Sequence, residues 1–122
     1  MIDLLAVGFG GFLGAATRYG ISVLMAGKAG LYSYWGTFAV NVIGCFFIGV
    51  LTGAEFKNLQ PLKLFLITGI LGGFTTFSAF GLECFYFLKN GEILKTLIYI
   101  FSTLFCGILS VYIGFLLCKI MR

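Results

Sequence analysis

Apolar residues run along this chain in four long blocks, and short segments between the blocks hold most of its charged residues. The blocks cover residues 4–26, 35–54, 64–82 and 96–118, so each is 19 to 23 residues long. About 20 helical residues cross the hydrocarbon core of a bilayer. The pattern therefore predicts one all-α membrane domain over residues 1–122, with four transmembrane helices.

The composition supports this and removes several functions. Charged residues make up 10% of the chain, against about 25% in a soluble domain. The chain has no histidine, which excludes an imidazole base and a histidine metal site. Its four cysteines follow neither a CxxC nor a zinc spacing, and we interpret them as packing residues. The basic residues stand singly and form no patch for nucleic acid. We expect a multi-pass protein of the cell membrane, not an enzyme and without a nucleic-acid partner.

The start of the chain resembles a cleaved signal peptide poorly. Asp3 stands where a basic residue is usual, and the apolar stretch continues beyond Arg18. We therefore keep residues 4–26 as the first span.

Lysine and arginine barely favour one orientation. With four spans, the second connection and the C-terminus share a side, which carries Lys57, Lys63, Lys119 and Arg122. The opposite side carries Lys28, Lys89 and Lys95, joined by Arg18 if that side chain reaches the interface. The positive-inside rule acts through the difference between sides, which here is one or zero. We expect an antiparallel, dual-topology homodimer about a two-fold axis in the membrane plane.

Three spans carry small-residue pairs that let helices approach closely. The GxxxG pairs are Gly10 and Gly14, Gly49 and Gly53, and Gly69 and Gly73. They serve packing within one subunit or between two subunits, with about even odds for any pair.

Polar residues inside the spans mark candidate functional positions, because unpartnered polar groups are costly in lipid. Asn41 lies near the middle of the second block, with Thr37 on the same helical face. Its amide either bonds a neighbouring helix or donates to a permeating anion. Arg18 either reaches the interface or faces a wet vestibule.

The third block is rich in residues that disfavour a helix, namely Gly69, Gly72, Gly73, Thr75, Thr76 and Ser78. We predict an interruption there, whose freed carbonyls suit a cation; a continuous glycine-rich helix is the alternative. Glu83 closes this block. Four residues of the last block follow helical spacing along one face: Tyr99, Thr103, Cys106 and Ser110. This stripe either lines an ion route or packs against other helices, and packing is favoured.

Three stretches in order along the chain, GGFLGAATRY (10–19), GTFAVNVIGCFFIG (36–49) and GILGGFTTFSAF (69–80), resemble the four-span fluoride channel family known as Fluc or CrcB. The resemblance implies a dual-topology homodimer with two fluoride pores, which carries fluoride passively out of the cell and so lowers its toxicity in the cytoplasm. Ala79 replaces a threonine common in this family, and Gly107 a serine that relatives can carry.

The resemblance also implies roles for single residues. Asn41 projects into the pore, and the ring edges of Phe77 and Phe80 contact the ion. Main-chain carbonyls of Gly72 and Thr75 hold a central sodium ion. The positions beside the ion route are Thr37, Thr76, Ser78 and Tyr99, while Arg18 and Glu83 match charged residues of the family.

Two other classes remain open on the residues alone. Small multidrug or guanidinium exporters are also short and dual-topology, but proton-coupled export of a cation needs a membrane-embedded carboxylate. The first block has only Asp3 at its edge, and Glu83 stands at a block end. A structural membrane subunit without transport is the third class.

Overall fold

The structure is a computed structural model that describes residues 1–26 and 34–122. Four crossings follow one another: α1 (Ile2–Ala26), α2 (Tyr34–Gly53), a composite third crossing and α6 (Ile93–Ile120). All four are long and apolar enough to span a membrane. The described residues contain no strand, so the prediction of an all-α protein with four spans is confirmed. Lys28 and the rest of the predicted first connection, residues 27–33, lie outside the described residues.

The third crossing consists of α3 (Gln60–Lys63), η2 (Leu64–Leu71), α4 (Gly72–Phe74) and α5 (Phe77–Lys89). It begins with Pro61 in its first turn, where a proline costs no helical hydrogen bond. The eight residues of η2 form a π-helix, which is rare and is frequently found at functional sites. This crossing runs over 30 residues, beyond the predicted limit of residue 82.

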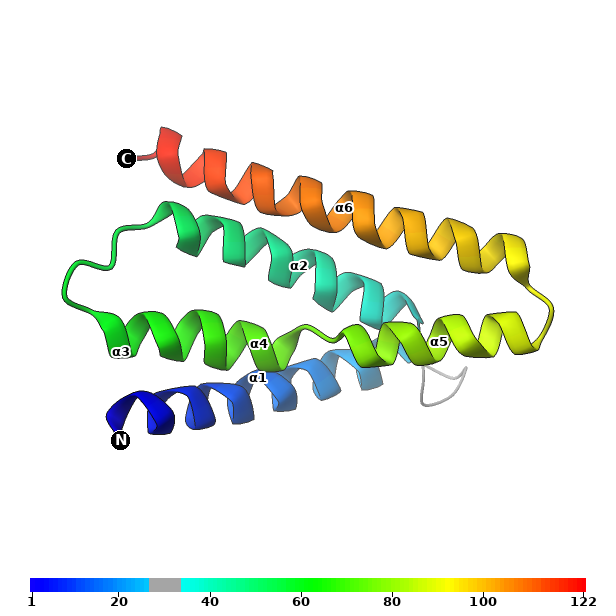
Figure 1. The fold of residues 1–122 in the computed structure, drawn as a ribbon, viewed down its shortest axis with the longest axis horizontal. Helices are drawn as coiled ribbons and strands as arrows, with labels where there is room; N and C mark the ends of the chain where they lie inside the picture. The colour runs from blue at the N-terminus through cyan, green and yellow to red at the C-terminus, as the bar shows by residue number, and fades with distance from the viewer. Residues whose placement is uncertain (27–33) are drawn as a thin grey trace.

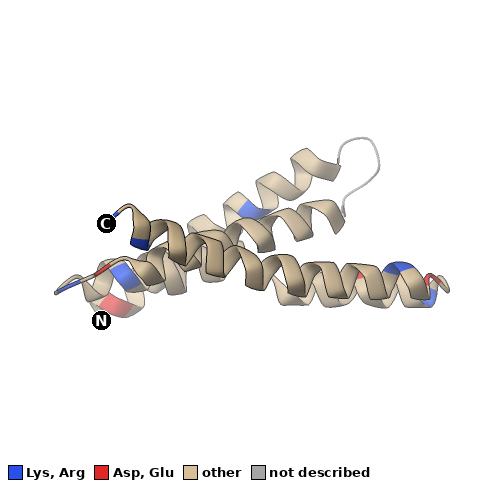
Figure 2. Cartoon of the chain, turned by 90° about the horizontal axis from the view of Figure 1, so that it is seen from above, with Lys and Arg blue, Asp and Glu red and all other residues tan. Residues whose placement is uncertain are grey.

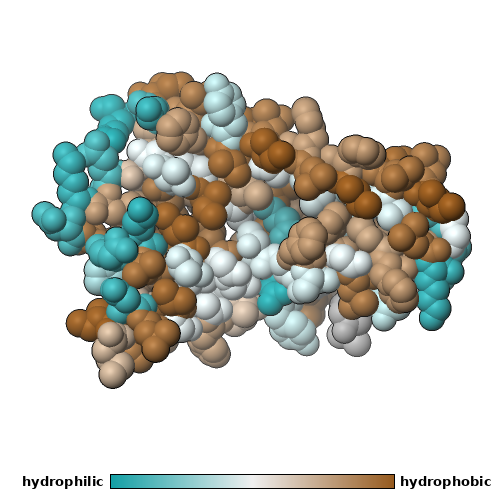
Figure 3. Space-filling view, in the orientation of Figure 1, coloured by the Kyte–Doolittle hydropathy of each residue, from teal (hydrophilic) through white to brown (hydrophobic). Residues whose placement is uncertain are grey.

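The helices form two tight pairs. Figure 1 shows α2 beside α6, and α1 beside the first half of the third crossing, with both chain termini at one end. Figure 2 shows that most charged residues lie near the two ends of the bundle. On the face drawn in Figure 3, pale and teal residues gather across the middle, between more apolar regions.

Glycines make each pair possible. A Cβ on Gly14 would collide with the Ile70 carbonyl oxygen, and one on Gly69 would come within 2.9 Å of the Gly10 Cα atom. A Cβ on Gly49 would collide with the Val111 carbonyl oxygen of α6. The GxxxG pairs therefore pack helices within the subunit, which was one of the two interpretations left open.

Large apolar side chains cover the outside of the bundle. Phe12, Phe101 and Ile108 are examples, at 66%, 68% and 71% exposed, while Val40 is the largest side chain that is fully buried. Such a surface would be unfavourable in water and is suited to lipid.

Candidate functional site

The third crossing is broken at Thr75 and Thr76. Helix α4 ends at Phe74, and both threonines are extended, with φ and ψ of −80° and 155° for Thr75 and −150° and 115° for Thr76. Thr76 then caps α5, because its Oγ1 accepts the Ala79 N–H at 3.2 Å. In Figure 1 the break falls midway along the crossing. The predicted interruption is confirmed.

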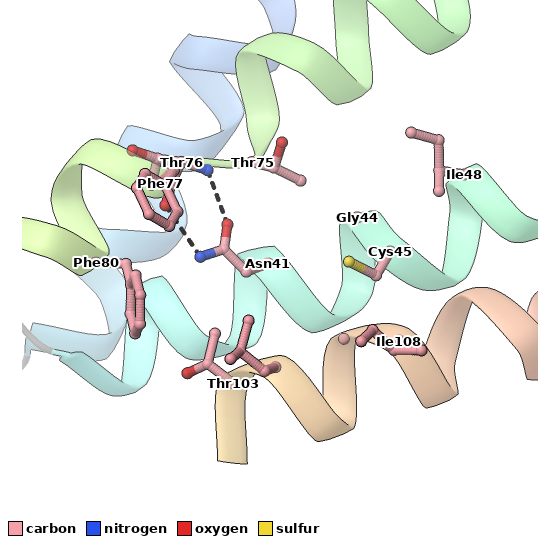
Figure 4. A pocket seen from close by; sticks show the side chains of 12 residues that line it. Asn41, Gly44, Cys45, Ile48, Thr75, Thr76, Phe77, Phe80, Thr103 and Ile108 are labelled. Carbon is pink, nitrogen blue, oxygen red and sulfur yellow. Dashed lines mark hydrogen bonds between the residues drawn. The ribbon is translucent and has the colours of Figure 1, made fainter. Parts of the chain in front are cut away.

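Asn41 holds this break from the neighbouring helix α2. The Thr76 N–H donates to Asn41 Oδ1 at 2.8 Å, and Asn41 Nδ2 donates to the Thr76 carbonyl at 3.0 Å (Figure 4). The side-chain amide thus replaces the backbone partners that a continuous helix would have supplied. This confirms that Asn41 bonds a neighbouring helix, and one of the two Nδ2 hydrogens remains for another acceptor.

The break releases main-chain carbonyls at the end of α4, including those of Gly72 and Thr75. In a continuous helix the Gly72 carbonyl would accept the Thr76 N–H, which here goes to Asn41. The Thr75 carbonyl would accept the Ala79 N–H, which here goes to the Thr76 hydroxyl. Gly72 lies at the surface of the subunit. Neutral carbonyl oxygens of this kind are ligands that hard cations accept.

A groove of about 310 Å³ lies where α2, the break and α6 meet. Most of its lining is apolar and includes Phe77 and Phe80. We call it the polar groove after the four polar residues in its wall: Asn41, Thr75, Thr76 and Thr103. Phe77 is 80% exposed and Phe80 is 7% exposed, with their ring centroids 5.7 Å apart. Figure 4 shows both rings beside the Asn41 amide. The structure therefore brings Asn41, Thr76 and the two phenylalanines together, as the family resemblance implies.

A second polar cluster lies next to this groove. Thr37 Oγ1 donates to Glu83 Oε1 at 2.6 Å, and the Tyr99 hydroxyl donates to Glu83 Oε2 at 2.7 Å. The three side chains are buried, and the Tyr99 ring packs on Phe80 with centroids 5.1 Å apart. Glu83 is therefore inside α5 and fully engaged, whereas the hydrophobic pattern placed it at a span end; that placement was wrong.

Ser78 and Arg18 lie differently from this core. Ser78 is exposed, with its Oγ 3.2 Å from Thr76 Oγ1, so it borders the break. Arg18 is half-buried on α1 and is not part of the groove wall. Within the described residues its Nε atom is buried without a hydrogen-bond partner.

Three of the four residues of the predicted stripe on the last span line two cavities, and Ser110 lines neither. Thr103 lines the polar groove, and its Oγ1 is buried without a hydrogen-bond partner among the described residues. Tyr99 and Cys106 line another cavity, described below.

Gly44, Cys45 and Gly107 also line this groove. The sequence analysis noted Gly107 only as a departure from a family serine, treated the cysteines as packing residues and gave Gly44 no role. Gly44 lies one helical turn from Asn41, and a Cβ there would collide with the Thr75 methyl group.

The chain matches the family model described as CrcB-like protein, Camphor Resistance (CrcB), over residues 5–115. It belongs to the CrcB family. The fluoride-specific ion channel FluC of Chlorobium phaeobacteroides is 44% identical over 119 residues, which cover 95% of this chain and 92% of the relative. The channel of the same name from Rhizobium meliloti is 42% identical and covers 99% of both chains. That of Thermus thermophilus is 39% identical, covering 91% of this chain and 90% of the relative.

Family membership confirms the resemblance seen in the three sequence stretches. Together with the four apolar helices, it identifies a multi-pass integral membrane protein. These relatives are named as channels and not as enzymes.

Proposed function

We propose that this CrcB-family protein is a fluoride-selective channel that carries fluoride passively out of the cytoplasm. Similarity to proteins named as fluoride channels along almost the whole chain supports this over a proton-coupled exporter. The driving force is the membrane potential, since a negative interior pushes anions outward. Hydrogen fluoride that enters uncharged and ionises inside would thereby be cleared, which lowers fluoride toxicity.

The polar groove has the donors that such a channel requires. Fluoride is small and strongly hydrated, so a selective route must replace water without binding the ion too tightly. The edges of Phe77 and Phe80 carry partial positive charge, and Asn41 keeps one free N–H beside them. Hydroxyls of Thr76 and Ser78 continue the route in this proposal. Thr37 and Tyr99 lie beside the route, where their hydroxyl protons are donated to Glu83. All of these donors are neutral, which favours release of the ion.

The observation that carries the proposal is a broken main chain, midway along the third crossing, with surface-exposed residues on both sides of the break. Gly72, Phe77 and Ser78 are exposed in the single subunit. Irregular backbone persists at this depth only where protein or a water-filled cavity covers it. A second copy of the chain would cover the polar groove and complete its wall. The near balance of basic residues on the two sides supports an antiparallel pair, in which both orientations occur in one membrane.

A sodium ion between the two copies fits the same break. The released carbonyls of Gly72 and Thr75 would hold it, and two copies would offer the same pair twice. An ion there supplies positive charge that draws the two broken segments together. The two residues named for the metal by the family resemblance are thus among those whose carbonyls lose their helical donors at the break.

Flux from liposomes tests the proposal. Purified protein is reconstituted in vesicles loaded with potassium fluoride or potassium chloride, and efflux is started with a potassium ionophore. We expect rapid loss of fluoride and retention of chloride. Equal loss of both ions would contradict selectivity, no loss would favour a structural subunit, and proton-driven cation export would favour the exporter class.

A further inference from the structure

A line of aromatic rings leads from the polar groove to the end of the bundle where α5 meets α6. The Tyr99 ring packs on Phe80 with a centroid separation of 5.1 Å, and it lies 5.8 Å from both Tyr34 and Phe87. Tyr34 and Phe87 are 5.3 Å apart. All four contacts are edge-to-face, and we call these four residues the aromatic line. The line links Phe80 of the groove to α2, α5 and α6.

Lys95 stands at the far end of the aromatic line. Its ammonium nitrogen lies 4.2 Å from the Phe87 ring centroid and 5.0 Å from that of Tyr34. A cavity of about 340 Å³ is lined by Lys95 together with Tyr34, Phe87 and Tyr99. Lys95 and the Glu83 partner Tyr99 therefore share one cavity, one helical turn apart on α6.

We infer that Lys95 is the cation that attracts fluoride to this mouth of the route, an inference that rests on the proposed function. A cation over the face of a ring is held by the ring's negative face, which leaves the positive edges turned elsewhere. The aromatic line thus connects Phe80 of the groove to a full positive charge through packed rings. A fixed charge at a channel mouth raises the local concentration of the opposite ion, and salt screens this effect.

Glu92 limits the field of Lys95. Its Oε2 lies 3.3 Å from the ammonium nitrogen, and both side chains are about two-fifths exposed, at 42% for Lys95 and 43% for Glu92. The pair is thus open to water and carries no net charge, so K95Q would leave the Glu92 carboxylate unpaired. Removing the carboxylate should raise fluoride conductance, whereas removing the ammonium should lower it. The two changes therefore test the sign of the effect.

The test measures fluoride conductance of the full-length protein in planar bilayers at constant low fluoride, with ionic strength raised by a salt of an impermeant anion. A unit charge acting across about 7 Å of water changes local anion concentration about two- to threefold. We expect K95Q to lower conductance by about that factor at 10 mM ionic strength, where the Debye length is about 30 Å, and to match the unmodified protein at 1 M, where it is about 3 Å. K95R should behave like the unmodified protein, and E92Q should raise conductance at low salt.

Lys89 supplies the matched control. It lies in the last turn of α5 at the same end of the bundle and is exposed. K89Q removes the same charge from outside the cavity and should lower conductance less than K95Q does. An unchanged K95Q conductance at low salt, an equal loss in K89Q, or a K95Q loss that persists at 1 M would overturn the inference. Absence of fluoride current in the unmodified protein would instead overturn the proposed function.

Discussion

Replacing Asn41 with alanine should release the break between α4 and α5. The substitution removes both partners of Thr76, the Oδ1 acceptor at 2.8 Å and the Nδ2 donor at 3.0 Å. Thr76 is buried, so its backbone groups would lose hydrogen bonds without gaining free access to water. We expect the extended pair Thr75 and Thr76 to open locally while the four crossings remain formed.

The magnitude follows from the two bonds. A protein hydrogen bond contributes about 0.5–1.5 kcal/mol net, and interhelical bonds in a membrane protein average about 0.6 kcal/mol. The two bonds of Asn41 therefore stabilise the closed break by about 1–3 kcal/mol. Since 1.4 kcal/mol is a factor of ten, exchange of the Thr76 amide hydrogen should accelerate by about 5- to 150-fold.

Hydrogen exchange of the protein in lipid nanodiscs measures this, read from peptides that span residues 75–79. Thr52→Ala is the matched control, because the only partner of the Thr52 hydroxyl among the described residues is the Ile48 carbonyl of its own helix, at 2.6 Å. It should leave exchange at the break unchanged. If Asn41→Ala also left the Thr76 amide as protected as before, the conclusion that the two Asn41 hydrogen bonds stabilise the break would be refuted.

Four further outcomes follow from the same structure. Phe80→Ile keeps bulk but removes the ring edge, so fluoride efflux should stop while size-exclusion elution is unchanged; normal efflux would argue against the ring contact. Gly14→Val forces a side chain against backbone and should lower thermal stability by about 1–3 kcal/mol, whereas an unshifted melting curve would contradict that packing. Arg122 holds the pKa of Glu55 below its ordinary value, so this contact stabilises the fold above that ordinary pKa and is lost as pH falls through the lowered one. In melting scans down to about pH 2, the unmodified protein should lose thermal stability as pH falls, and Glu55→Gln should lose less. The same pH dependence in both proteins would count against a stabilising role of this contact. Three lysines added to the turn between α5 and α6 should trap one orientation and abolish efflux, and full activity from a uniformly oriented population would exclude the antiparallel pair.

The span positions were readable from the sequence because bilayer thickness sets the length of an apolar block. The interruption was readable too, since glycines and hydroxyl residues concentrate within ten positions of the third block. Family motifs added Phe77 and Phe80, which composition alone could not single out among 15 phenylalanines. These features depend on local sequence or on recurring motifs.

Features that depend on distant partners were not readable. The hydrogen bonds that hold the break join Asn41 to Thr76, which lies 35 positions away. Glu83 looked like a span end because a lone carboxylate is costly in lipid; its partners Thr37 and Tyr99 stand 46 and 16 positions away. The choice of helix partner for each GxxxG pair likewise required the fold.

The two hydrogen bonds between Asn41 and Thr76 form within one polypeptide. Each newly inserted copy can therefore form its break between α4 and α5 before it meets a second copy. Under the proposed pairing, two folded subunits would associate as rigid bodies, without refolding in the lipid. Copies made at different times and pointing in opposite directions could then find one another late, so biogenesis would demand no coordinated synthesis of the two.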